Sequence, residues 1–334
     1  MASQPKENLD RLRAHKLLDS YHGEVDDFFK LWPADKLYFF SRDKKAFLAY
    51  GISHKAAICM GDPVGPPDSI KFLLIQFKDY CDEKDLTMAF IQTNNKCRDA
   101  YKLIGLHNIL IGSDAVIDID HFLSQTIHNK YFRNLVNRKD KQKFEVSTYL
   151  PPHNKTLLNE IEVISNSWIK LPHRKEWSFL TGRFDNDYLQ QVVLQVLRDE
   201  KGKAQAFVNE IPSYKPGVFT IDLMRHRSGA PANCMDFLFI DIIKTKRKEG
   251  FKSFNLGMSP IDGQKYVSNL ADSLLLSTYK LSNSFIGFRG LHQFKAKYEP
   301  NWDPRYVWYQ GSVLNLPRIG WAVYSLLRSK GDIK

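Results

Sequence analysis

Residues 219–239 read FTIDLMRHRSGAPANCMDFLF, and this stretch decides how we interpret the rest of the chain. Its first part alternates apolar and polar residues, as a half-buried strand does. Charged side chains then gather at Asp222, Arg225 and Arg227, a Ser-Gly-Ala-Pro turn follows, and an apolar run begins the next element. Because loops at strand ends often carry binding or catalytic groups, we predict a functional strand-loop-helix unit here.

The composition is that of a folded protein with an excess of positive charge. The chain has 334 residues, of which 43% are hydrophobic, and a formal net charge of +11. This length predicts about two domains. The charge favours a polyanionic partner, either nucleic acid or an anionic membrane surface, and a basic protein without such a partner is the alternative.

Cysteine usage and hydropathy narrow the cellular setting. The four cysteines (Cys59, Cys81, Cys97 and Cys234) form no CxxC pair, so we expect neither a zinc site nor a disulfide framework, and a reducing, cytoplasmic setting. The N-terminus lacks the apolar core of a secretory signal. The chain contains no apolar run of about 18 residues, the length that suggests a membrane span.

The order of elements divides the chain into three parts. We predict an N-terminal helical segment over residues 1–34, a first domain over 35–150 that opens with three short strands, and a second domain over 151–334. The stretch NILIGSDAVIDI (108–119) predicts a pair of strands around Gly-Ser-Asp, and residues 266–281 predict a helix. Strands and helices alternate in both halves, which predicts a mixed α/β (α+β) fold.

The order strand, charged loop, helix, strand, helix, strand resembles that of a GNAT acyltransferase. In that fold the loop after the central strand holds the pyrophosphate of coenzyme A on backbone N–H groups. The matching stretch is RHRSGA (225–230), where Ser228 replaces the first glycine, which weakens the case for coenzyme A. A helix N-terminus flanked by Arg225 and Arg227 still suits a phosphate or an oxyanion. A local salt bridge between Asp222 and Arg225 is the structural alternative.

A second dense stretch, FRGLHQFKAKYEPNWDPRYVWY, covers residues 288–309. Charged groups alternate there with aromatic rings, a pattern that suits a phosphate-bearing ligand with stackable or apolar parts. An aromatic core segment with solvated lysines is the alternative. The candidates in this stretch are Arg289, His292, Lys295, Lys297, Glu299 and Arg305.

Six stretches in a fixed order resemble the phosphatidylglycerol aminoacyltransferases, the lysyl-phosphatidylglycerol synthases known as multiple peptide resistance factors. They lie between about residues 35 and 310. Six ordered motifs are far more specific than any single one. The stretches are YFFSRDKKAFLAYGISHKAAICMGDPVG, SDAVIDIDHF, WSFLTGRFD, FTIDLMRH, FNLGMSP and GLHQFKAKYEPNWDPRYVWY.

The resemblance implies a fold of two GNAT-like domains in tandem around a shared passage, and it implies a reaction and its partners. An aminoacyl-tRNA, which we expect to be lysyl-tRNA, gives its amino acid to a glycerol hydroxyl of phosphatidylglycerol at the cytoplasmic face of the bacterial membrane. The cationic product lipid lowers susceptibility to cationic antimicrobial peptides. The ester is already activated, so we expect no cofactor and no metal. Full-length members also carry a transmembrane part, so this chain would be an excised domain or a short member.

The resemblance also implies catalytic roles for Asp222, Arg225 and Lys297, matched motif by motif. We expect Arg225 and Lys297 to face a phosphate or the oxyanion, and Asp222 to orient Arg225 or to bind the α-amino group of the amino acid. The lipid hydroxyl would attack directly, without an acyl-enzyme. Further binding candidates, each with a structural role as the alternative, are Glu176 and Glu210 for a lysine ammonium, His226 and His292 as bases, and Arg227, Arg289, Lys295, Glu299 and Arg305.

Two other stretches suit the two polyanionic substrates. Residues 128–146, HNKYFRNLVNRKDKQKFEV, could meet the phosphates of a tRNA acceptor stem, and an exposed helix with solvated lysines is the alternative. Residues 316–334 combine apolar and basic residues as an interfacial membrane helix does. The alternative for this helix is that it closes the core of the second domain.

Four other functions remain open at this point. The chain could be an alanyl-phosphatidylglycerol synthase, an acyl-coenzyme A-dependent GNAT enzyme or a tRNA-dependent transferase acting on cell-wall precursors. It could also be a non-catalytic module that binds membranes or RNA.

Overall fold

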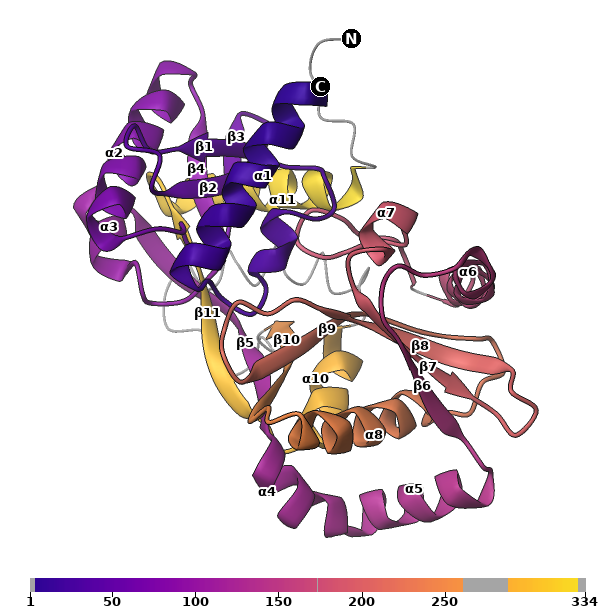
Figure 1. The fold of residues 1–334 in the computed structure, drawn as a ribbon. Coiled ribbons are helices and arrows are strands. Elements are labelled where there is room, and N and C mark those ends of the chain that lie inside the picture. The colour runs from indigo at the N-terminus through magenta and orange to yellow at the C-terminus, as the bar shows by residue number, and fades with distance from the viewer. Residues whose placement is uncertain (1–3, 173, 261–287, 330–334) are drawn as a thin grey trace.

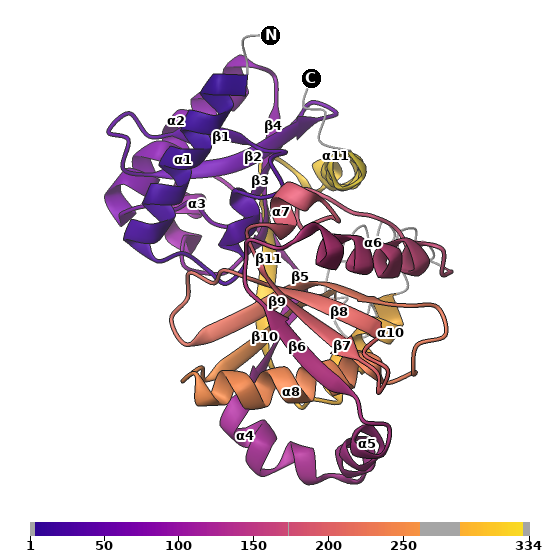
Figure 2. The same cartoon turned by 45° about the vertical axis from the view of Figure 1, so that its right-hand side comes forward.

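The computed structural model describes residues 4–172, 174–260 and 288–329 (Figure 1). The helix predicted at 266–281 lies outside these residues. One sheet of 11 strands runs through the molecule in the order β1-β2-β3-β4-β11-β5-β10-β9-β8-β7-β6, and helices pack on both of its faces (Figures 1 and 2). The predicted mixed α/β class is confirmed.

The N-terminal segment and the first half contain the predicted helix and three short strands. Their elements are α1 (Gln4–Tyr21), the 3-10 helix η1 (Asp27–Lys30), β1 (Leu37–Phe40), β2 (Phe47–Ser53), β3 (Ala56–Met60), α2 (Pro67–Glu83), β4 (Thr87–Thr93), α3 (Arg98–Leu103) and β5 (His107–Asp118).

The second half follows a helical connection. Its elements are α4 (Ile119–Ser124), η2 (Thr126–His128), α5 (Lys130–Lys141), β6 (Glu145–Tyr149), α6 (Lys155–Ile169), α7 (Asn186–Leu189), β7 (Val193–Arg198), β8 (Ala204–Ile211), β9 (Val218–His226), α8 (Cys234–Lys248), β10 (Ser253–Pro260), α10 (Phe288–Ala296), β11 (Asn301–Tyr309), η3 (Val313–Asn315) and α11 (Leu316–Arg328).

The prediction of two strands around Gly112 is wrong, because β5 is one continuous strand of 12 residues. It pairs with β10 on one side and with β11 on the other, so both of its edges are occupied. Gly112 serves close approach and not a turn: a Cβ atom there would lie 2.5 Å from the carbonyl oxygen of Ser259 on β10.

The two halves repeat one pattern of pairing and exchange their last strands. In each half an antiparallel run ends in a parallel pair, β3 with β4 and β9 with β10. The last strand of the first half, β5, then pairs with β10, and β11 of the second half pairs with β4. β5 and β11 lie side by side at the centre (Figures 1 and 2). The division of the chain at about residue 150 stays a prediction.

The sheet separates two large apolar clusters, the first of which extends into both halves. One cluster lies toward α6, α7 and α11 and includes Tyr188, Phe207 and Leu223. The other lies toward α5 and α8 and includes Phe237 and Tyr298. The C-terminal stretch forms the expected helix, but α11 packs on β2 and β3 of the first half.

Candidate active site

A β-bulge in β9 places two charged side chains on one face of the sheet. The register between β8 and β9 shifts at Asn209, so that Asp222 and Leu223 both lie opposite this residue, whose Oδ1 accepts a hydrogen bond of 2.8 Å from the Leu223 N–H. In a regular strand, side chains three residues apart point to opposite faces. The bulge instead turns Asp222 and Arg225 toward α6 and the 174–185 loop, which connects α6 to α7.

The parallel pair β9–β10 opens at the same point. Residues 218–220 of β9 pair with residues 253–255 of β10, and the pairing of these two described strands ends there. β9 continues to His226 beside β8, whereas β10 continues to Pro260 beside β5. The two strands therefore diverge where Asp222 and Arg225 lie, and a separated strand pair offers unpaired backbone groups to a ligand.

Asp222 is a partly buried carboxylate with an unusual titration. The Tyr188 hydroxyl donates to Asp222 Oδ2 over 2.6 Å, and Asn209 Nδ2 donates to the Tyr188 oxygen over 2.9 Å. Burial raises the pKa of Asp222 to about 6. A carboxylate with such a pKa can take up a proton and release it again near neutral pH.

Gly182 lets the 174–185 loop approach this carboxylate. A Cβ atom at position 182 would lie 2.1 Å from Asp222 Oδ2 and 2.5 Å from the Tyr188 hydroxyl oxygen. A larger residue would therefore push the loop away from Asp222. The close approach of the loop to Asp222 therefore explains why a glycine stands in the WSFLTGRFD stretch.

Arg225 is held by Glu176 and not by Asp222. Its Nη1 and Nη2 donate to the two carboxylate oxygens of Glu176 over 3.0 and 2.5 Å, and Nη1 also donates to the Ser165 hydroxyl. The guanidinium carbon lies 5.0 Å from the centre of the Trp168 ring. Such a planar, forked pair fixes geometry. In this arrangement Glu176, predicted to hold a lysine ammonium, ties the loop to β9.

Lys36 and Arg183 are two further cations in the surroundings of the 174–185 loop. Lys36 is buried, pairs with Asp35 and feels the charges of both Asp222 and Arg183, and burial lowers its pKa. Arg183, in the 174–185 loop, has a buried Nη1 without a hydrogen-bond partner among the described residues. This buried donor, in the loop that approaches Asp222 at Gly182, is available to an incoming oxygen atom.

Lys297 lies in a different environment, among side chains of the α5–α8 cluster. Its ammonium is 2.5 Å from a carboxylate oxygen of Asp236 and 4.0 Å from the centre of the Phe294 ring. Asp236 also accepts hydrogen bonds from the hydroxyls of Tyr131 and Tyr298. None of the contacts recorded for Lys297 within the described residues involves Asp222 or Arg225.

Three other candidates lie along the central strands. Lys295 is buried and donates to the carbonyls of Gly257 and Met258 over 2.9 Å each, and burial lowers its pKa to about 8. Arg305 is buried and pairs with Asp114 over 2.6 Å. The ring of His292 stacks on Trp302, with centroids 4.6 Å apart.

The remaining candidates are apart from Asp222 or satisfied locally. Glu210 pairs with Lys246 of α8 over 2.7 Å, and Glu299 is exposed and accepts from Thr126. In the loop after β9, a ring nitrogen of His226 lies 2.9 Å from the carbonyl oxygen of the next residue, and Arg227 Nε donates to the Ala204 carbonyl over 2.6 Å. Arg289 belongs to α10, and its side chain lies outside the described part.

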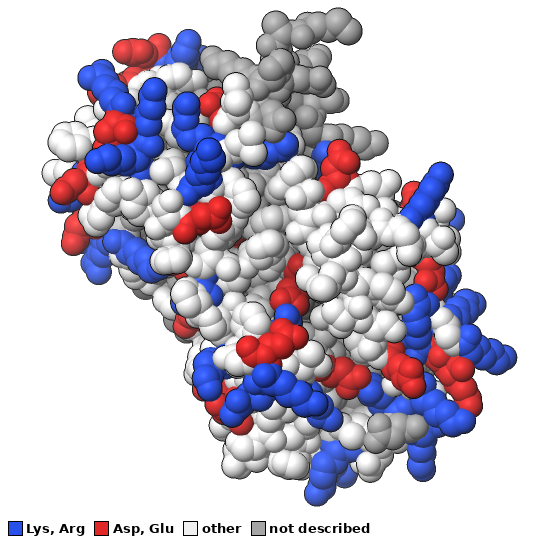
Figure 3. Space-filling model, viewed as in Figure 1, with Lys and Arg blue, Asp and Glu red and all other residues white. Residues whose placement is uncertain are grey.

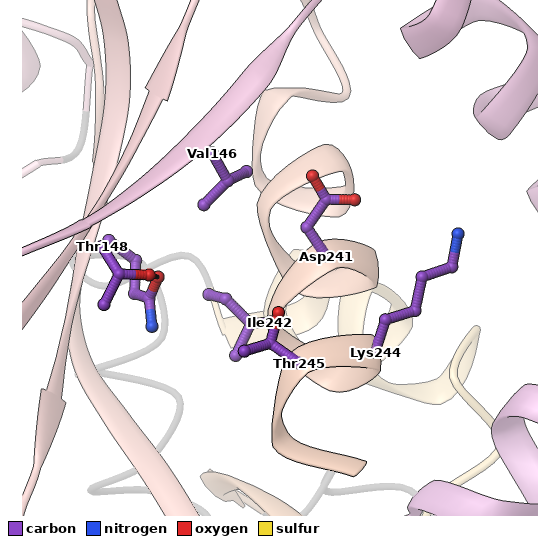
Figure 4. Close-up of a pocket in the computed structure, with 7 residues that line it drawn as sticks. Val146, Thr148, Asp241, Ile242, Lys244 and Thr245 are labelled. Atoms are coloured by element: carbon purple, nitrogen blue, oxygen red, sulfur yellow. Dashed lines mark hydrogen bonds between the residues drawn. The ribbon is translucent and has the colours of Figure 1, made fainter. Parts of the chain in front are cut away.

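A polar pocket of about 180 Å³ lies between β6, β7 and α8 (Figure 4). Thr148 stands on its strand side, and α8 supplies the opposite wall. Asp241 of that wall is paired with Lys139 of α5 over 2.7 Å. The pocket therefore lies on the α8 side of the sheet, away from Asp222. Its lining residues are Val146, Thr148, Gln195, Asp241, Ile242, Lys244 and Thr245.

The basic stretch at 128–146 forms α5, which buries Phe132 and Leu135 and exposes its charges. Figure 3 shows Lys and Arg side chains over the end of the molecule where α5 lies. Among the described residues, no three His, Cys, Asp or Glu side chains gather as metal ligands would. None of the described helices has the length and apolar content needed to cross a bilayer.

Sequence reasoning missed the partners that shape this site. Tyr188, Arg183 and Lys36 carry no spacing pattern that marks them, and the fold alone brings them to Asp222. Gly182 was the one available signal, because it interrupts an aromatic stretch directly before Arg183. The functional roles assigned to Asp222, Arg225 and Lys297 stay predictions.

Comparison with known proteins identifies similar chains. The family model described as phosphatidylglycerol lysyltransferase, C-terminal, matches residues 15–309. The phosphatidylglycerol lysyltransferase of Staphylococcus haemolyticus (strain JCSC1435) is 28% identical over 310 residues, which are 92% of this chain and 36% of that protein. The chain therefore spans just over a third of the length of the curated relatives it matches.

Two solved structures are similar over nearly the whole chain. L-PGS from Bacillus licheniformis is 28% identical with a TM-score of 0.85, covering 96% of this chain and 97% of that one. The C-terminal domain of a putative lysylphosphatidylglycerol synthetase from Agrobacterium fabrum is 27% identical with a TM-score of 0.81, covering 97% and 99%. The predicted tandem GNAT-like fold and the resemblance drawn from six stretches are confirmed.

Proposed function

The chain belongs to the family of phosphatidylglycerol lysyltransferase C-terminal regions, and from this membership we propose that it transfers a lysyl group from lysyl-tRNA to a glycerol hydroxyl of phosphatidylglycerol. The relatives are phosphatidylglycerol lysyltransferases, which supports the lipid acceptor and the choice of lysine. The product lipid would carry additional positive charge and lower susceptibility to cationic antimicrobial peptides.

One observation carries the proposed mechanism: Asp222, a carboxylate of raised pKa, lies where two parallel strands diverge, and the loop that approaches it at Gly182 also carries Arg183. Asp222 takes the proton of the lipid hydroxyl, and the hydroxyl oxygen attacks the ester carbonyl carbon. The bond to the ribose oxygen of the tRNA breaks, and that oxygen receives the proton from Asp222. A carboxylate with a pKa near 6 suits both transfers.

The charge that develops on the carbonyl oxygen needs donors. The buried Nη1 of Arg183, which has no hydrogen-bond partner within the described part of the chain, suits this purpose. Arg225 and Glu176 act as positioning residues, since their pairing fixes the loop that carries Arg183. We propose that Lys297 acts at a distance from Asp222, by ordering α5 and α10 around Asp236.

The test is direct. The chain is incubated with phosphatidylglycerol vesicles and tRNA charged with labelled lysine, or in parallel with labelled alanine, and the label is followed into the organic phase. We expect label in lipid from lysyl-tRNA and its loss with Asp222→Asn. Label from alanyl-tRNA alone would overturn the choice of donor. Absence of label from both donors, with a folded protein, would overturn the proposed reaction for this chain.

A further inference from the structure

The outer face of α11 carries an exposed apolar patch that is opposite the buried face of the helix. Leu316, Ile319 and Ala322 are buried on the sheet. Trp321 of α11 is 60% exposed, and Leu314, in η3 directly before α11, is 75% exposed. The sheet therefore covers one apolar side of this segment and leaves these two side chains uncovered.

The first half extends this patch. Ile52, at the end of β2, is 41% exposed, and the ring of His54 in the β2–β3 turn stacks on Trp321 with centroids 6.0 Å apart. α11 packs directly on β2 and β3, so the turn and the helix form one continuous surface. We call Ile52, His54, Leu314 and Trp321 the α11 face.

Cationic side chains surround the α11 face. Arg318 and Arg328 are exposed on the helix, and Lys55 is exposed in the β2–β3 turn. Asp85 pairs with Lys55 over 2.7 Å, and Arg318 Nη1 lies 3.5 Å from the Thr87 hydroxyl. Arg328 Nη1 donates to the Tyr324 hydroxyl over 3.1 Å, and neither arginine has an ion pair among the described residues. An indole ring with neighbouring cations is the combination that favours the boundary between lipid headgroups and acyl chains.

The α11 face is connected to the site by short contacts. The Ser178 N–H donates to the Leu327 carbonyl over 2.9 Å, and the rings of Trp177 and Tyr324 lie 6.3 Å apart. Ser178 belongs to the 174–185 loop, whose Glu176 pairs with Arg225. α11 and the 174–185 loop therefore connect the α11 face to the point where β9 and β10 diverge.

We propose that the α11 face docks on an anionic phospholipid bilayer and brings the 174–185 loop to the lipid surface. This inference rests on the proposed function, because it assigns the surface through which the chain reaches its lipid substrate. The apolar residues enter the headgroup region while Arg318 and Arg328 contact lipid phosphates. Binding should depend on both contributions, apolar burial and charge.

The test measures co-sedimentation with two kinds of vesicle, one of equal parts phosphatidylglycerol and phosphatidylcholine and one of phosphatidylcholine alone. We expect Trp321→Glu to weaken binding to the mixed vesicles by roughly tenfold or more. The matched control is Phe72→Glu, because Phe72 is 63% exposed on α2, on the opposite face of the first-half sheet. We expect the control to bind as the unmodified chain does.

Several outcomes would overturn the proposal. They are unchanged binding of Trp321→Glu, an equal loss with Phe72→Glu, or equal binding to both kinds of vesicle. Quenching of tryptophan fluorescence by brominated phosphatidylglycerol gives a second measurement. We expect quenching in the unmodified chain and its loss in Trp321→Phe, which retains five other tryptophans out of the six; quenching retained in Trp321→Phe would count against the proposal.

Failure of docking and failure of the proposed reaction are distinguishable. A short-chain phosphatidylglycerol that dissolves as monomers needs no docking. If docking is correct, Trp321→Glu transfers lysine to the dissolved lipid as the unmodified chain does and loses transfer to vesicles. If the proposed reaction is wrong, no label enters either lipid, while the vesicle-binding result is still readable.

Discussion

In both halves of the sheet an antiparallel run of strands ends in a parallel pair, but the two parallel pairs end differently. β3 and β4 pair over five residues (56–60 with 87–91), and the Gly61 N–H continues the ladder to the Ile91 carbonyl over 2.8 Å. β9 and β10 pair over three residues and then separate. The same arrangement of strands is closed in the first half and open in the second, so the second half is where a ligand can contact strand backbone.

Each half places a carboxylate near the end of its parallel pair. Asp62 is buried and accepts hydrogen bonds of 2.9 Å from the Asn94 N–H and from the Tyr101 hydroxyl. Asp222 lies in the bulge and is only partly buried. Burial raises the pKa of both to about 6. Similar titration in a closed and in an open environment shows that the pKa alone does not identify a site; access to a ligand is the second requirement.

The largest expected effect separates these two carboxylates. Asp222→Asn keeps the size of the side chain and an acceptor for the Tyr188 hydroxyl, but it cannot take up the proton. We expect lysyl transfer to fall about a thousandfold. Asp62→Asn is the matched control, and we expect its transfer rate to stay close to that of the unmodified chain. Equal losses in both variants, at equal thermal stability, would contradict the contrast between the halves.

Arg225→Lys tests the ion pair between Arg225 and Glu176, which lies where β9 and β10 diverge. A lysine keeps the charge but loses the forked pairing with Glu176 and the contact with Trp168. We expect transfer to fall about a hundredfold, because the loop carrying Arg183 is no longer fixed. Glu176→Gln should show a similar defect, and the double variant should be hardly worse than either single one. Additive losses would show that the two residues act independently.

The pH dependence of lysyl transfer is a further test of the role of Asp222. If Asp222 accepts the proton, transfer should fall about tenfold per pH unit below the pKa of about 6 and level off above it.

The stability of the fold should depend on pH in the opposite direction from the transfer rate. A carboxyl whose folded pKa is raised stabilises the fold when protonated, and this contribution is lost as pH rises through about 6. Asp222→Asn should therefore unfold at a higher temperature than the unmodified chain at pH 8, and this difference should shrink toward pH 4.

Much of this contrast could not be predicted from the sequence, although the element types could. The three short strands at 37–60 and the strand-loop-helix unit at 219–239 follow from alternation, turn residues and apolar periodicity. The exchange of β5 and β11 does not, because local periodicity carries no information on which strand pairs with which. The error at Gly112 has the same origin: a glycine between apolar runs resembles a turn, whereas here it admits a neighbouring strand.

The candidate site was predicted as separate residues, and the structure groups them differently. Asp222, Arg225 and Glu176 come together because a bulge changes the alternation of β9, and a bulge has no clear mark in FTIDLMRH. Glu210 falls on the α8 side with Lys246. Arg183 and Tyr188 stayed unnoticed because their importance depends on a loop conformation fixed by Asp35 and α11 through contacts distant in sequence.

The smallest expected effect on the reaction concerns Lys297. Its ammonium neutralises buried Asp236 at the junction of α5, α8 and α10, and burial lowers the pKa of Lys297. Lys297→Met leaves that carboxylate with only its tyrosine partners, so we expect a loss of about 1–3 kcal/mol in the free energy of unfolding. Transfer at a temperature where the variant is folded should fall only a few-fold, since Asp222 and its partners are untouched.

A double variant decides whether Lys297 acts through Asp236. Adding Asp236→Asn removes the charge that Lys297 neutralises, so the stability loss of the pair should be smaller than the sum of the two single losses. Chemical denaturation gives the stabilities, and the lipid-labelling assay gives the rates. A loss of transfer as large as that of Asp222→Asn, in a Lys297→Met protein of unchanged stability, would place the ammonium at the reacting groups. The reacting groups would then include a residue next to α10, on the face of the sheet opposite Asp222.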